Sequence, residues 1–268
     1  MNQKIVNSKP ELESHSQQEA INHCKNCGAQ YSGCYCSDCG QSSNTGVITL
    51  SGAFSNLISH FTDLDNKLFY TLRHMFLNPG TASLNYVLGQ RVKYIHPIKY
   101  FIIAMGLNLL AISEMQSQGT LTASKLQLPE FINIPEQEKQ AIVLWVAKYA
   151  HMLMVALLPI YGYFLSLLFD KKRTAGESTA FLFYLYANLA LVSFLVLLFT
   201  SVLQSQYLHY VSSLFFIVYS SWAILKFFEM RFSQGFWRIG VSYLCYSLVA
   251  LILILGVFKG YEIWLNLS

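Results

Sequence analysis

Five of the six cysteines in this chain lie in one short stretch, "CKNCGAQYSGCYCSDCG", at residues 24–40. Four of them form two pairs with two residues between the members and a glycine after the second: Cys24 with Cys27, and Cys36 with Cys39. This spacing is typical of metal-binding knuckles, because both sulfurs of a pair can face one ion. Four thiolates close a tetrahedral shell around zinc and leave no open position, which predicts a structural site.

Two alternatives to zinc stay open at the cysteines, namely an iron–sulfur or redox site and a disulfide cluster. A cytoplasmic location argues against disulfides, because thiols stay reduced there. Cys34 lies two residues before Cys36, which does not fit a knuckle, so we interpret it as a spare that could exchange with a ligand. With little hydrophobic core nearby, metal binding would supply the folding free energy of this segment.

The composition is that of a membrane protein. Hydrophobic residues make up 54% of the 268 residues and charged residues only 12%, about half the usual charged fraction of soluble domains. Five apolar stretches approach or reach the length needed to cross a bilayer. They are Pro97–Ser113, Tyr149–Phe169, Ala180–Leu203, Leu208–Phe228 and Phe236–Phe258. The predicted fold class is therefore an all-α integral membrane protein, with about five transmembrane helices and a small N-terminal zinc ribbon that has four cysteine ligands.

The charges of the loops predict the orientation. Lys and Arg gather before the first stretch, after the second and after the fourth, and the opposite loops carry few of them. The N-terminus has no apolar segment of the signal-peptide type. We expect a bacterial inner (cell) membrane protein with a cytoplasmic N-terminus and an external C-terminus. A net charge of +4 without a long basic run predicts no nucleic-acid partner.

Four regions are expected along the chain: a disordered tail at 1–22, the ribbon at 23–44, amphipathic juxtamembrane helices at 46–95 and transmembrane helices at 96–268. Within 46–95, apolar residues recur every three or four positions from Leu50 to Met75 and predict a helix. "NPG" at Asn78–Gly80 should stop it, and Gly89 should end a shorter helix. Whether these helices pack on the membrane domain or lie on the cytoplasmic leaflet stays open.

Two further groups of polar residues are candidate sites. Lipid-headgroup binding, or simple orientation of the protein, is the interpretation of a basic and aromatic cluster made of Arg91, Lys93, Tyr94 and Lys99. An intramembrane polar site would use Asn108, Lys148, His151 and Asn188. The alternatives for the second group are interhelical hydrogen bonds of the asparagines and an interfacial position for the lysine.

The order of motifs resembles that of a bacterial family of unknown function. The residues that carry the resemblance are "CKNCGAQYSGCYCSDCGQ", "FYTLRHMFLNPG" and "YVLGQRVKYIHPIKYF", within Cys24–Tyr100. Members of that family pair a zinc-ribbon-like motif with a "T…L…PG…GkR..Y..P" segment and a few transmembrane helices. Gln90 departs from the lysine expected before Arg91. The resemblance implies an architecture and no activity.

No signature of an enzyme is visible, neither a P-loop nor a GxSxG, HExxH or dinucleotide-binding motif. The predicted function is a non-enzymatic interaction or scaffold role, with the lipid bilayer and a cytoplasmic protein bound by the ribbon as partners. The alternative is a small transporter or channel in which the ribbon forms a cytoplasmic cap.

Overall fold

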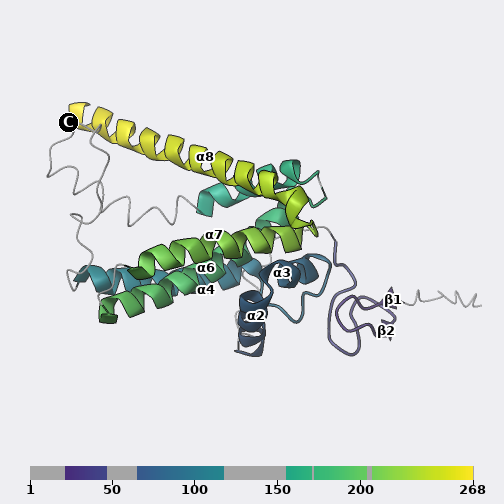
Figure 1. The fold of residues 1–268 in the computed structure, drawn as a ribbon. Coiled ribbons are helices and arrows are strands. Elements are labelled where there is room, and N and C mark those ends of the chain that lie inside the picture. The colour runs from purple at the N-terminus through teal and green to yellow at the C-terminus, as the bar shows by residue number, and fades with distance from the viewer. Residues whose placement is uncertain (1–21, 47–64, 118–154, 171, 204–206, 268) are drawn as a thin grey trace, which may run out of the picture.

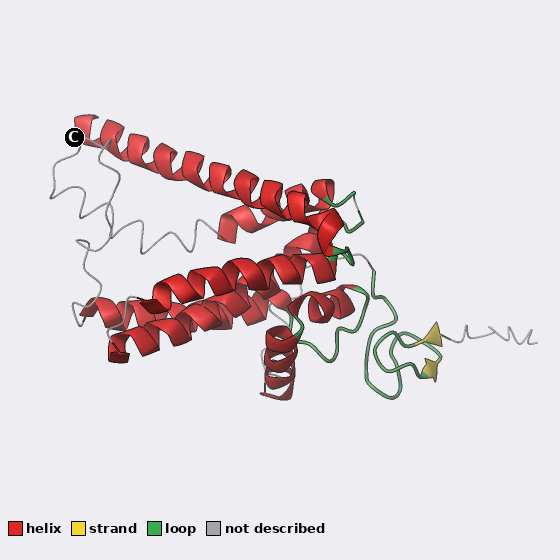
Figure 2. Ribbon diagram, in the orientation of Figure 1, coloured by secondary structure: helices red, strands yellow, loops and turns green. Residues whose placement is uncertain are grey.

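The computed structural model describes residues 22–46, 65–117, 155–170, 172–203 and 207–267 (Figure 1). Its elements are β1 (Asn22–His23), β2 (Gln30–Tyr31), α2 (Asp65–Leu77), α3 (Pro79–Val87), α4 (Pro97–Ser117), α6 (Ala175–Leu203), α7 (Tyr207–Phe227) and α8 (Phe232–Leu267). The two strands form an antiparallel hairpin in the cysteine segment, which lies at one end of the long helices (Figures 1 and 2). Residues 1–21 of the predicted tail lie outside the described residues.

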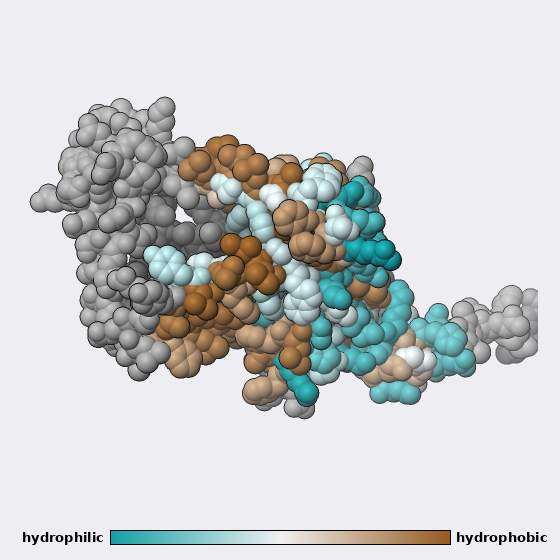
Figure 3. All heavy atoms as spheres, in the orientation of Figure 1, coloured by the Kyte–Doolittle hydropathy of each residue, from teal (hydrophilic) through white to brown (hydrophobic). Residues whose placement is uncertain are grey.

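In the described part of the chain, four helices are long and apolar enough to cross a membrane, so the chain is a multi-pass membrane protein by helix length and hydropathy. The candidate spans are Pro97–Glu114, Ala175–Phe199, Tyr210–Phe227 and Phe232–Leu253. Of the second predicted stretch, Tyr149–Phe169, residues 149–154 lie outside the described part, and Val155–Leu168 is a shorter apolar helix. Apolar side chains cover much of the described helical surface in Figure 3, whereas polar ones gather toward the ribbon end.

Ring contacts and hydrogen bonds show in which direction the long helices run. Phe101 contacts Phe183 and the Asn108 side chain donates to Ala190 O, so α4 and α6 run parallel. Phe181 stacks on Phe227, and Asn188 reaches Tyr219, so α7 runs antiparallel to α6. Because α4 and α6 point the same way, the chain between them must return to the ribbon end.

The α2–α3 pair packs against the long helices. The break between α2 and α3 falls at "NPG" as predicted, but α3 begins at Pro79 itself, since proline fits the first position of a helix. Most of α3 is buried, and it packs on α6 and α7. Gly89 follows with φ +117°, a conformation that favours glycine. The part of the predicted helix at 47–64 lies outside the described residues.

The backbone carbonyl of Met75 is the main polar link between α2 and the long helices. In an uninterrupted helix its partner would be the N–H of residue 79, but Pro79 has no N–H. Instead, Tyr219 Oη of α7 and Asn188 Nδ2 of α6 donate to Met75 O, the latter at 3.2 Å. Tyr100 Oη donates to Asn188 Oδ1 at 2.8 Å. Two helices thus donate to one buried carbonyl, and Tyr100 of α4 holds one of the two donor side chains in place.

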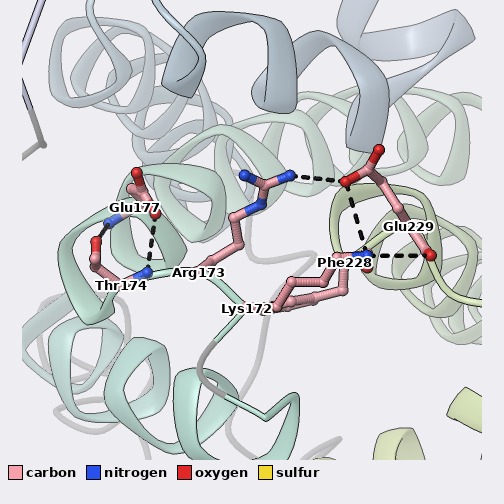
Figure 4. A network of polar contacts seen from close by, with 6 residues as sticks. All are labelled: Lys172, Arg173, Thr174, Glu177, Phe228 and Glu229. Carbon is pink, nitrogen blue, oxygen red and sulfur yellow. Dashed lines mark hydrogen bonds and ion pairs between the residues drawn. The ribbon is translucent and has the colours of Figure 1, made fainter.

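Two loops at the ribbon end are joined by polar contacts that Figure 4 shows. Thr174 and Glu177 form a reciprocal capping box at the start of α6, with N–H to side-chain oxygen distances of 2.9 and 3.2 Å. Arg173 Nη2 lies 2.8 Å from Glu229 Oε2, and Lys172 Nζ donates to Phe228 O at 2.8 Å. These contacts hold the start of α6 beside the end of α7.

Gly80→Ala should destabilise the fold, because α3 approaches α7 too closely for a side chain there. An added Cβ would lie 2.5 Å from Lys226 Cβ and 2.8 Å from the backbone N of Phe227. We expect a loss of about 1–3 kcal/mol, measured as a lower Tm in detergent. Gly106→Ala is the matched control, since its Cβ would meet nothing within 4 Å. An equal Tm for both variants would contradict the close approach.

Candidate metal centre

The four paired cysteines converge on one point. Their sulfurs all lie within 4.8 Å of one another: Cys24, Cys27, Cys36 and Cys39. The shortest separations are 3.5 Å, between Cys24 and Cys39, and 3.6 Å, between Cys27 and Cys36. A disulfide is about 2.05 Å long, so the thiols are free. A zinc ion with Zn–S bonds of about 2.3 Å would separate sulfurs by about 3.8 Å at a tetrahedral site, which fits this arrangement.

The backbone repeats the same turn at both cysteine pairs. Gly28 N donates to Cys24 O at 2.8 Å, and Gly40 N donates to Cys36 O at 2.9 Å. Both glycines have positive φ, +82° and +70°, which explains the glycine after each pair. Each first cysteine also donates its own N–H five residues ahead, to Ala29 O or Gln41 O. The two knuckles therefore bring four sulfurs together from two matching turns.

The electrostatics of the cluster favour a cation. Burial of the Cys24 sulfur opposes its ionisation, but backbone N–H groups of Cys27 and Asn26 donate to it, and the net effect lowers its pKa to about 6. At Cys27 the N–H of Ala29 also favours the thiolate, yet burial and the neighbouring sulfurs raise the pKa to about 12. Four thiolates this close repel one another, so full ionisation needs a bound positive ion. The cluster can hold a metal ion, with four sulfur ligands.

Cys34 does not join this cluster. It is exposed, and its backbone O accepts a hydrogen bond from Ser43 N at 2.8 Å. The neighbouring Tyr35 is also exposed, at 67% of its surface. The sixth cysteine, Cys245, lies in α8, far along the chain from the ribbon.

The ribbon is docked on the loop between α3 and α4. Gln41, the residue after the second knuckle, is buried, and its Oε1 accepts the backbone N–H of Arg91 at 3.1 Å. Arg91 Nη2 donates to Gly46 O at 2.6 Å. At Gly89 an added Cβ would lie 2.8 Å from Lys25 Cδ, so the ribbon side chain packs directly on that glycine. These contacts connect the metal centre to the membrane helices.

The structure distributes the predicted basic and aromatic cluster over different environments. Arg91 holds the ribbon, and Lys93 is exposed. Tyr94 and Lys99 are buried. Burial, Lys99 and Arg91 together lower the pKa of His96 to about 4. The four predicted residues thus do not share one exposed surface.

The predicted intramembrane site is described in part. Lys148 and His151 lie outside the described residues. Asn108 and Asn188 are both buried, and their side chains bond to Ala190 O and to the group around Met75 O. In the described part of the chain the two asparagines therefore link helices to one another, as intramembrane amides commonly do.

Sequence reasoning assigned no role to two residues that support the site. Gln41 had a signal, since it follows "CSDCG" directly, within the motif that carries the family resemblance, and the structure buries it. Tyr219 had none, because a tyrosine inside an apolar stretch is common at membrane interfaces. Its hydroxyl partner is a backbone carbonyl more than a hundred residues away, which no local pattern indicates.

Residues 65–108 match the model of a family described as a protein of unknown function, DUF3667. No curated protein and no solved structure matches the chain. The matched segment covers α2, α3 and the start of α4, and the cysteine cluster lies outside it. It contains the second part of the motif order noted above: Thr71, Pro79, Gly80, Gly89, Arg91, Tyr94 and Pro97.

The geometry of the four sulfurs fits one metal ion per chain, and we expect this ion to be zinc. We expect elemental analysis of the detergent-purified protein to find one zinc, and Cys36→Ser to lose most of it, because a ligand and one of the paired turns are changed. Cys34→Ser is the matched control and should keep its zinc. Iron in place of zinc, or loss of metal from Cys34→Ser alone, would contradict the assignment.

Proposed function

We propose that this chain is a five-span protein of the bacterial inner membrane whose cytoplasmic zinc ribbon serves as a non-enzymatic docking platform. Cys24, Cys27, Cys36 and Cys39 would hold the zinc as a structural ion. The observation that carries the proposal is the contact between Gln41 and Arg91, together with the packing of Lys25 on Gly89. A ribbon braced in this way is a rigid surface and not a loosely tethered domain.

The direction of the helices supports five crossings and the proposed orientation. Since α4 and α6 run parallel, an odd number of crossings must separate them. Val155–Leu168 ends beside the start of α8, where Arg238 Nη1 donates to Leu168 O at 2.9 Å. The positive charges of Lys172, Arg173 and Arg231 lie in loops at the ribbon end, which favours a cytoplasmic ribbon.

The bonding of the polar residues within the helices favours a platform over a transporter. Asn108 and Asn188 are each occupied by hydrogen bonds between helices, so they do not present free amides to a passing solute. The exposed ribbon surface around Tyr35 is then the part of the protein that would meet a cytoplasmic protein partner, because an exposed tyrosine is a common anchor at protein interfaces.

A photo-crosslinking amino acid in place of Tyr35 tests this role in cells. We expect one discrete protein adduct that disappears in Cys36→Ser, where the ribbon loses its metal, and weakens in Gln41→Ala, where the ribbon loses its dock. Gln41→Ala should keep its zinc and show faster hydrogen exchange at the Arg91 amide. Asp38→Ala is an exposed control and should leave both the zinc content and this exchange rate unchanged. An adduct that is unchanged in both Cys36→Ser and Gln41→Ala would contradict the platform. Solute uptake by the purified protein in vesicles would contradict it too.

A further inference from the structure

Helix α2 lies across the long helices and not along them. Figure 1 shows α2 running across the direction of α4, α6 and α7, close to the ribbon end. Its Met75 carbonyl bonds to Tyr219, which precedes the end of α7 at Phe227 by eight residues, or about 12 Å at 1.5 Å per residue. The structure thus shows α2 crossing the long helices near the ribbon end, where the described surface in Figure 3 changes from apolar to polar.

The two sides of α2 differ in what covers them. Thr71 and Met75, one turn apart, are fully buried against the rest of the protein. On the opposite side, Phe69, Arg73 and Leu77 follow at steps of four and are exposed, Phe69 at 70% and Leu77 at 59% of their surfaces. Two large apolar side chains are thus uncovered on a helix that crosses the long helices near the ribbon end.

Cationic groups lie beside this exposed face. The His74 ring packs against Tyr70 at a tilt, with ring centroids 4.1 Å apart, and its Nδ1 lies 3.3 Å from Tyr94 Oη. Arg73 directly precedes His74 in the chain and Lys93 directly precedes Tyr94, and burial together with these two charges lowers the pKa of His74. Arg73 and Lys93 themselves are exposed. The two charged side chains beside His74, Arg73 and Lys93, are both positive, which favours the binding of an anion here.

We propose that α2 lies in the leaflet at the ribbon end, with Phe69 and Leu77 among the lipid chains and with Arg73 and Lys93 binding the phosphate of an acidic phospholipid. The occupant is lipid because Phe69 and Leu77 are exposed apolar side chains next to the apolar long helices, and because the positive charges of Arg73 and Lys93 are complementary to an acidic headgroup. An interfacial helix of this kind buries its apolar face in the headgroup and acyl boundary. The inference goes beyond the platform role and does not depend on the metal.

The depth of α2 can be measured in vesicles of phosphatidylcholine and phosphatidylglycerol. A nitroxide on Phe69→Cys, in the full chain with Cys34→Ser and Cys245→Ser, should collide with dissolved oxygen more than with a water-soluble nickel chelate. A nitroxide on Ser32→Cys, exposed on the ribbon, is the matched control and should show the reverse. Equal access of the chelate to both labels would overturn the placement of α2 in the leaflet.

The headgroup site can be measured by native mass spectrometry of the protein released from mixed-lipid nanodiscs. Arg73→Gln and Lys93→Gln should each lower the preference for phosphatidylglycerol over phosphatidylcholine about fivefold, as expected for one charge near a membrane surface. Arg231→Gln removes one exposed charge at the same end and should change it less than twofold. An equal loss in all three variants would show that only the total positive charge at this end matters, and would overturn the site.

Discussion

The packing of α2 on the long helices depends on the backbone carbonyl of Met75, which has no hydrogen-bond donor within its own helix. Pro79 breaks the helix after α2 and leaves Met75 O without an N–H donor, in a place where an unbonded carbonyl would cost several kcal/mol. Tyr219 and Asn188 supply the missing donors and so join α2 to α7 and α6. The same solution recurs at Ile95, whose N–H is bound by Thr71 Oγ1 and whose carbonyl is bound by Tyr184 Oη.

The metal centre depends on this arrangement indirectly. The loop between α3 and α4 is fixed by the packed helices at its two ends. The ribbon contacts this loop at Gly89 and at the N–H of Arg91. The ribbon itself has only a small core around Cys24, Tyr31 and Cys36, so a metal ion held by the four cysteines would provide most of its stability. The interhelical hydrogen bonds and the four-cysteine ribbon thus meet at one loop.

Local sequence patterns predict those parts of the structure that depend on residues close together in the chain. The two Cys-x-x-Cys-Gly turns predicted the four-sulfur cluster, and long apolar runs predicted the helices that can cross a membrane. The break at "NPG" was predicted, but not that α3 begins at Pro79 itself, because proline both ends one helix and begins the next. Gln41 with Arg91, and Tyr219 with Met75, join residues distant in the chain, and no periodicity or spacing in one sequence reveals such pairs.

The central claim is that donors from the long helices satisfy the carbonyl of Met75, and infrared spectroscopy of that carbonyl tests it most directly. With ¹³C at the methionine carbonyls, the difference spectrum between the wild type and Tyr219→Phe isolates any carbonyl that Tyr219 bonds. The account predicts a shift of one ¹³C band to higher wavenumber, since a carbonyl that loses a hydrogen bond stiffens. Unchanged ¹³C bands in a folded Tyr219→Phe protein would contradict it.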